Sequence, residues 1–314
     1  MPRPRLVLLS ALLAVSSITA CEKKTTLVVP DEGAGGQGAP AATEQIVLRY
    51  GPGAKTLRQK ASMETTTNGG GQFVEAKVDF TAKLAVTEQA GKLKVAWAID
   101  GVDEVSVSGA LQGQGQGDPK AFLTSTARGA YLTDLQGRTD AAVSDTLPEN
   151  QAMQQKLEQV QREVQAKTAA GEPPQYPAGA DVLPYLQPVI QLPTLPEQGL
   201  EVGKAMTIEK EEERDLASVG VVLPLSIATT YTLVRVDGSG STRIAEVQFS
   251  GEAGGQAQGQ VGTVTITSEY EGTLLFDLDQ AVPVSYDVTR TESWNLGPVT
   301  GETTTVIKAT WELG

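Results

Sequence analysis

The chemistry available to this chain depends on its carboxylates, because histidine is absent and cysteine occurs only once. The 314 residues include 38 Asp and Glu, one cysteine and no histidine. Without histidine, neither a Ser-His-Asp triad nor the usual zinc and copper sites can form. One thiol cannot make an intrachain disulfide or a cysteine-ligated metal site. We therefore predict a non-enzyme with no catalytic residues, no metal and no cofactor.

Paired carboxylates are the only groups in the sequence whose pattern suggests acid/base chemistry. The candidates are Asp277 with Asp279 in a predicted strand, the predicted turn with Asp100, Asp103 and Glu104, and the acidic strand end 209–213. A glycosidase needs two carboxylates across a cleft, normally beside aromatic platforms, and aromatic residues make up only 5% of the chain. A calcium site needs at least six oxygens, which no loop here supplies. We interpret each group as a solvated face or turn, so a carboxylate-dependent hydrolase is the least favoured function.

The single cysteine, Cys21, closes a segment with the layout of an export signal. Arg3 and Arg5 precede an apolar run, 6–14, that is too short to cross a bilayer as a helix, and small residues follow it. The last four residues, Ile-Thr-Ala-Cys, resemble the bacterial lipobox, in which the cysteine is lipidated and becomes the first residue. The resemblance implies a signal peptide over residues 1–20 and a lipid anchor on Cys21.

Acyl chains on Cys21 would determine where the protein resides. Each buried methylene contributes about 0.8 kcal/mol, so two or three chains hold a protein at a membrane almost permanently. Glu22 follows the cysteine, where an Asp would indicate inner-membrane retention under the enterobacterial sorting rule. We expect an outer-membrane lipoprotein facing the periplasm, with surface exposure and the inner membrane as alternatives.

Net charge excludes one class of partner. The whole chain has a formal net charge of −13, and loss of Arg3 and Arg5 with the signal peptide leaves −15. So acidic a surface repels phosphate backbones, which argues against nucleic acid as a partner. The partners that remain are the membrane through the lipid on Cys21, a lipid or apolar ligand, or another envelope protein.

The pattern of residues divides the chain into a tether, two β halves and a helical insert. Residues 21–45 are rich in Gly, Ala and Pro and are predicted to be a flexible tether. A first β half follows over 46–145 and a second over 202–314. Alternation with a period of two is clearest in one predicted hairpin. Its apolar face carries Val78, Phe80, Ala82, Leu84 and Val86 on one strand and Leu93, Val95, Trp97 and Ile99 on the next.

The insert, residues 146–201, combines a helix with a proline-rich connector. Met153, Leu157, Val160 and Val164 recur at helical spacing after Pro148. The prolines beyond the helix exclude a second long helix and favour short turns and extended pieces.

Similar segments recur in the same order in the two β halves. "GAKTLRQK" is answered by "GKAMTIEK", and "TAKLAVTEQAGKLKVAWAIDG" by "TYTLVRVDGSGSTRIAEVQFSG". Later, "RGAYLTDLQG" is answered by "EGTLLFDLDQ", which matches Asp134 with Asp277. We therefore predict a mainly β fold with two similar antiparallel halves, as open curved sheets or half-barrels, or one continuous sheet.

The segments "VLRYGPGAK", residues 149–168, "LPTLPEQGLEVG" and the strands with Asp134 and Asp277 resemble a family of bacterial exported lipoproteins. That family has an uncharacterised, duplicated β-rich domain and no assigned activity. The resemblance covers residues 46–313, but Ala205 and Met206 stand where a nearby Trp is expected.

The predicted arrangement is also distantly similar to periplasmic lipoprotein carriers, in which an unclosed barrel holds acyl chains. A concave apolar face, half covered by the predicted helix, would suit that role. The side chains that would line it are Phe80, Leu84, Trp97, Met153, Leu157, Leu233 and Phe249. The alternative is that the same side chains form an ordinary core between sheet and helix. We expect a non-catalytic binding lipoprotein for an apolar or lipid ligand, with a structural or assembly lipoprotein as the alternative.

Overall fold

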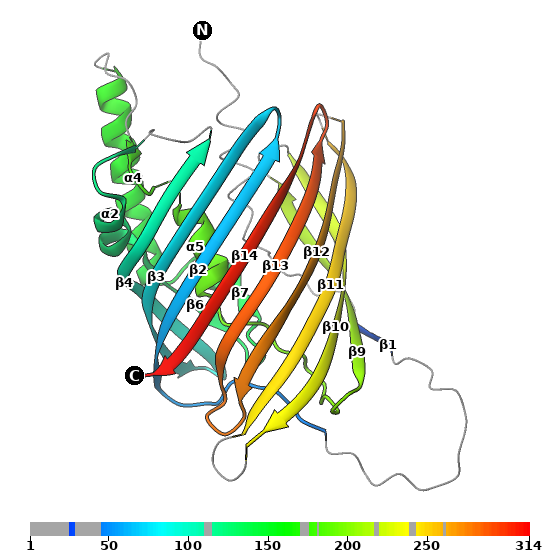
Figure 1. Cartoon of the computed structure of the whole chain (residues 1–314). Helices are drawn as coiled ribbons and strands as arrows, with labels where there is room; N and C mark the ends of the chain where they lie inside the picture. The colour runs from blue at the N-terminus through cyan, green and yellow to red at the C-terminus, as the bar shows by residue number, and fades with distance from the viewer. Residues whose placement is uncertain are drawn as a thin grey trace, which may run out of the picture.

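A computed structural model shows a mainly β protein built on one large antiparallel sheet (Figure 1). It describes residues 25–28, 45–109, 115–169, 176–180, 182–216, 220–238, 243–259 and 262–314. In this part of the chain, twelve strands form the sheet in the order β1-β9-β10-β11-β12-β13-β14-β2-β3-β4-β6-β7. The mainly β, antiparallel fold predicted from the sequence is confirmed. Cys21 and the signal segment lie outside the described residues.

The long strands fall into two groups along the chain. The first comprises β2 (Lys55–Gly69), β3 (Gln72–Gln89), β4 (Lys92–Gly109), β6 (Arg128–Thr133) and β7 (Thr139–Asp140). The second comprises β9 (Ala205–Leu216), β10 (Val221–Asp237), β11 (Ile244–Gly259), β12 (Gly262–Asp277), β13 (Val282–Leu296) and β14 (Val299–Leu313). The last strand, β14, pairs with β2, so the two groups join into one sheet.

Alternation of residue types gives the sheet one buried and one solvated face. Along β2, nearly every second residue is buried, because side chains of a strand point alternately to the two faces. Leu57 pairs with Leu84, Leu233 with Val247, and Ile307 lies on the same side. We call the side with these five residues the concave face. Short turns join the strands: Gly70 and Gly71 link β2 to β3 with φ of 59° and 75°, which suits the hairpin turns that need two positive φ values.

The sheet curls between β9 and β13, and β11 lies midway between these strands. The concave side of its second half carries only small residues, from Gly251 to Ala257 at every second position. At Gly255, a Cβ would lie 2.1 Å from the carbonyl oxygen of Pro224, so only glycine lets the β10 backbone approach this closely. The curl brings β9 across from β13, where Arg214 meets Glu292 although three strands lie between them.

Aromatic side chains cover glycines on the neighbouring strand. The directly paired residues are Trp97 with Gly129, Phe249 with Gly272, Tyr270 with Gly251, and Trp294 with Gly301. In each pair the ring lies within about 3 Å of where a glycine Cβ would stand. The rings thus bury the exposed backbone of the glycines, an arrangement that stabilises glycine within a sheet.

Strand β4 contains two irregularities at residues that the sequence pattern had placed in a turn. Asp100, Asp103 and Glu104 were expected in a turn, but all three lie inside β4. The pairing of β3 with β4 shifts register twice, leaving Asp100 and Asp103 without a partner residue on β3. These are β-bulges, which bend a strand and increase its twist.

Helices lie against the concave face and beside the outer strands β4, β6 and β7 (Figure 1). They are α2 (Pro119–Thr126), α3 (Ala141–Ser144), α4 (Pro148–Ala169) and α5 (Leu183–Ile190), and a small second sheet pairs β5 (Gly115–Gln116) with β8 (Tyr176–Pro177). The short helix α5, with Pro188 inside it, lies under the sheet, while α4 packs beside β6. Asn150 of α4 caps β6 by accepting from the N–H of Ala130 and donating to its carbonyl oxygen.

Part of the expected tether belongs to the sheet. Residues Thr25–Val28 form β1, which pairs antiparallel with Thr207–Lys210 of β9. The sequence pattern gave no sign of a strand there, because four polar and branched residues do not establish an alternation.

Candidate binding site on the concave face

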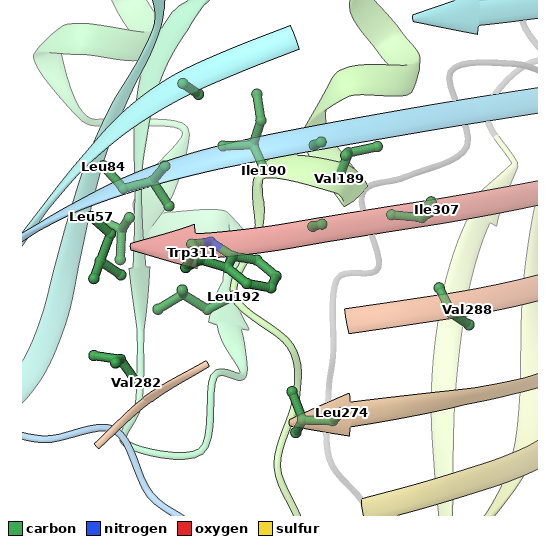
Figure 2. Close-up of a cluster of buried hydrophobic side chains, with 14 of the residues drawn as sticks. Leu57, Leu84, Val189, Ile190, Leu192, Leu274, Val282, Val288, Ile307 and Trp311 are labelled. Atoms are coloured by element: carbon green, nitrogen blue, oxygen red, sulfur yellow. The ribbon is translucent and has the colours of Figure 1, made fainter. Parts of the chain in front are cut away.

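The concave face is apolar around β2, β3 and β14, and the chain itself covers it there with α5 and the proline-rich connector. Figure 2 shows Val189 and Ile190 of α5 close to β2, and Trp311 of β14 directed toward Leu192 of the connector. All four are at most 5% exposed. The cover is therefore a short apolar segment and not a second sheet, which distinguishes this core from that of a β-sandwich.

A few buried polar side chains attach the cover to the sheet. The Tyr131 hydroxyl accepts a hydrogen bond from the Leu192 N–H at 2.9 Å, and Tyr50 donates to the Pro193 carbonyl oxygen at 2.7 Å. Gln59 donates to the carbonyl oxygen of Val189 at 2.7 Å. Burial raises the pKa of both tyrosines, so both remain neutral donors and acceptors at physiological pH. These contacts satisfy backbone groups that the sheet cannot pair.

A charged cluster lies on the concave side of the more distant strands. Arg214 of β9 donates to Glu292 of β13 at 3.1 Å, and Arg290 donates to the same carboxylate at 2.6 Å. On β9, Lys210 pairs with Glu212, which is 4% exposed. Burial lowers the pKa of Arg214, and the charge of Glu292 opposes that shift. Among the described residues, one oxygen of Glu212 has no hydrogen-bond partner, so the cluster keeps one free acceptor.

This cluster was missed in the sequence, where residues 209–213 were interpreted as a solvated strand end. The structure corrects this for Glu212, a residue that is 4% exposed, and Arg214 just beyond the segment is buried to the same extent as a residue. The signal that could have found them is the period of two from Ile208 to the buried Leu216, which puts Glu212 and Arg214 on the inward face.

A cavity of about 450 Å³ opens where the concave face meets one end of the sheet. Its walls come from the segment 45–52, from Phe276 near the end of β12, from residues 278–281 after β12, and from Lys55 and Arg243. Arg243 forms a two-point ion pair with Asp279 at 3.0 and 3.2 Å. Lys55 donates to the carbonyl oxygen of Gln280, and burial lowers the pKa of Lys55, opposed by the charge of Asp277.

A second, shallower hollow of about 570 Å³ lies among β10, β11, β12 and β13. Most of its lining is polar and belongs to the solvated face, including Thr230, Thr232, Glu271 and Asp287. Short Thr and Ser side chains leave the hollow open to solvent. Its two carboxylates, Glu271 and Asp287, lie on this polar surface and are not enclosed. It does not have the apolar, enclosed form of a typical small-molecule site.

The seven predicted ligand-binding residues are only partly brought together. Phe80, Leu84 and Leu233 are at most 2% exposed in the main core, and Trp97 and Phe249 pack against it. Met153 and Leu157 are half-buried on α4, which packs against β6 instead of covering the concave face. Of the seven, Phe249 alone lines either cavity. Their role as ligand contacts stays a prediction.

The remaining carboxylate candidates have structural partners. Asp277 accepts from the N–H groups of Asp279 and Gln280 at 2.9 and 2.7 Å, which closes the turn after β12. Asp279 pairs with Arg243, and this ion pair lowers the pKa of Asp279. Glu212 and Glu292 both lie near Arg214, but neither lines the two cavities described above.

Two other features are absent from the described residues. No helix there has the length and hydropathy to cross a membrane. In the same residues, no three His, Cys, Asp or Glu side chains gather as a metal ion would require. In comparisons with known proteins, no protein-family model and no curated protein matches this chain.

Proposed function

We propose that this chain is an outer-membrane lipoprotein, anchored through Cys21, that holds an apolar or lipid ligand against the concave face of its sheet. The observation that carries the proposal is the cover. A wide apolar face is closed by the eight-residue helix α5 and a connector, which are attached through a few hydrogen bonds that involve Gln59, Tyr50 and Tyr131. A ligand that displaces this cover gains the same apolar contacts.

The arrangement is similar to the unclosed barrel of periplasmic lipoprotein carriers. An open, curled antiparallel sheet with a helical cover leaves an entrance at the ends of its strands, as the mouth of a closed barrel does. The cavity beside Lys55 lies at such an end and reaches Phe276, a core residue that is 1% exposed. A ligand entering there would have a direct path to the apolar face. The mechanism is binding and release, with no bond made or broken.

We also infer that the sheet consists of two similar halves, each extended by its own connections. Strands β2-β3-β4-β6 and β9-β10-β11-β12 follow one another in the same order and are all paired antiparallel. Asp134 and Asp277, which correspond in the sequence repeat, each accept a hydrogen bond at 2.9 Å from the N–H two residues later. The same turn at the same point in both halves supports a duplication.

Native mass spectrometry tests the binding proposal. The chain carries Cys21→Ser and a cleavable export signal in place of residues 1–20, and it is purified from the periplasm without detergent. We expect a co-purifying lipid that dissociates from the protein on activation. A chain that carries no lipid and takes up none from added fatty acid would contradict the proposal.

The three tryptophans locate the ligand. Trp311 lies at the cover and Trp97 packs against the main core, whereas Trp294 belongs to a separate apolar cluster near the other end of the strands. A brominated fatty acid quenches tryptophans that it touches. We expect Trp294→Phe to keep most of the quenching and Trp311→Phe to lose a large part of it. The reverse result would move the ligand away from the concave face under α5.

An assembly lipoprotein is the second candidate, and the edge of the sheet favours it. In the described part of the chain, β1 pairs with four residues of the twelve in β9. The remaining edge offers backbone donors and acceptors to a strand of another protein. A stoichiometric protein partner in the same mass spectra, in place of a lipid, would favour this function.

A further inference from the structure

The cavity at the mouth of the concave face is cationic in an acidic protein. Arg49, Lys55 and Arg243 all line it, with Asp279 as the single acid in its lining. The chain as a whole has a formal net charge of −13. A local surplus of positive charge in such a chain focuses anions at this opening.

The cations stand directly beside the apolar core. Lys55 begins β2 and lies on the same side of the strand as Leu57, a core residue that is 1% exposed. Phe276 lines the cavity and packs edge-on against Tyr50, with ring centroids 5.6 Å apart. Leu278 adds a second apolar wall. A single molecule in this cavity would meet positive charge at one end and core side chains at the other.

We propose that this cavity binds the phosphate-type anionic headgroup of a lipid whose apolar part lies against the concave face. The inference rests on the proposed lipid-binding function and adds the class of lipid. Guanidinium groups recognise phosphate oxygens by paired hydrogen bonds, and a lysine adds a point charge. The volume of about 450 Å³ is in the range of small-molecule sites.

Two short-chain lipids of equal chain length separate charge from apolar contact. Dihexanoyl phosphatidylglycerol carries a phosphate with one negative charge, whereas dihexanoylglycerol has the same acyl chains and no phosphate. Each is titrated into the soluble Cys21→Ser chain by calorimetry. We expect the anionic lipid to bind at least about tenfold more tightly, since hydrogen bonds to charged groups contribute that much or more. Equal affinity would overturn the headgroup site.

Variants in the cavity need a matched control. Lys55→Gln and Arg49→Gln remove one charge each, while Lys60→Gln removes the same charge from the opposite face of the same strand. Arg243 is left intact because it pairs with Asp279. We expect the first two variants to bind phosphatidylglycerol about tenfold more weakly and dihexanoylglycerol within about twofold of the original. If Lys55→Gln behaves as Lys60→Gln does, the site is wrong.

The remaining outcomes distinguish the two proposals. If both lipids bind equally well and the variants have no effect, the headgroup site fails and the lipid-binding function stands. If neither lipid binds, the function itself fails. Inorganic phosphate should compete weakly with phosphatidylglycerol. If phosphate alone binds as tightly as the lipid does, the lipid assignment is overturned in favour of a free oxyanion.

The pH dependence gives an independent readout. Lys55, Arg49, Arg243, Asp277 and Asp279 are the titratable groups in or beside the cavity. Burial lowers the pKa of Lys55 below its usual 10.5. Lys55 should therefore lose its proton, and affinity for phosphatidylglycerol should fall, at a lower pH than for a site built on an exposed lysine. Lys55→Gln should remove this pH dependence. Persistence of the dependence in Lys55→Gln would contradict the role of that lysine.

Discussion

The ion pair between Arg214 and Glu292 should couple the two sides of the curled sheet. The side chains are 5% and 17% exposed, so the charges are largely removed from water. Breaking a buried pair by removing one partner costs about 3–5 kcal/mol, whereas replacing both partners with apolar residues can be nearly neutral. Because Arg290 also donates to Glu292, that carboxylate keeps a partner when Arg214 is lost. We therefore expect Arg214→Met to cost about 2 kcal/mol.

A double-mutant cycle measures the coupling. Glu292→Leu leaves Arg214 and Arg290 with less negative charge beside them, so it should cost about 3 kcal/mol. The double variant Arg214→Met with Glu292→Leu should cost about 2 kcal/mol less than the sum of the single variants, because it removes both charges together. Urea unfolding followed by tryptophan fluorescence and circular dichroism gives the free energies.

The control is an exposed cross-strand pair of the same chemistry. Arg235 of β10 donates to Glu246 of β11, and the Arg235 side chain is 61% exposed. Arg235→Met should cost no more than about 1 kcal/mol. Additive effects at Arg214 and Glu292, within about 0.5 kcal/mol, would refute the reasoning that the pair joins β9 to β13.

Two further predictions concern the sheet. Gly301→Ala would put a Cβ 2.3 Å from the ring of Trp294, so it should cost about 1–3 kcal/mol in urea unfolding. Gly254→Ala, whose Cβ would have no neighbour closer than 3.9 Å, should change stability by no more than about 0.5 kcal/mol; equal effects would exclude a role for the ring. Asn150→Ala removes both hydrogen bonds to Ala130, so it should cost about 1–3 kcal/mol and speed hydrogen exchange of the Ala130 amide. Unchanged exchange there would show that Asn150 does not cap β6.

The fold class could be predicted from the sequence because strand periodicity is a local property. The alternation from Val78 to Val86 and from Leu93 to Ile99 predicts the pairing of β3 with β4, and the structure confirms it. The curl could not be predicted in this way. It depends on Gly255 and the small residues of β11, and their effect appears only when the neighbouring strands are present.

The candidate site was harder to predict, because its parts come from distant segments. The cavity joins Arg49 and Lys55 to Arg243 and Asp279, which are about 190 residues or more along the chain from them. The cover was assigned to the helix with Met153 and Leu157, because that segment has a regular helical period. That helix buries only a narrow apolar stripe, with Val164 at 5% exposure. The short α5 has a mostly apolar sequence, and it packs into the main core against the concave face.

The pairing of β1 with β9 shortens the linker between the proposed lipid anchor on Cys21 and the folded sheet. Only residues 22–24 separate Cys21 from Thr25, and four extended residues reach at most about 14 Å. On the proposed lipidation, the β9 side of the sheet would therefore rest against the headgroup layer, with little freedom to turn away. A lipid could then pass between bilayer and protein over a distance shorter than the hydrocarbon core is thick.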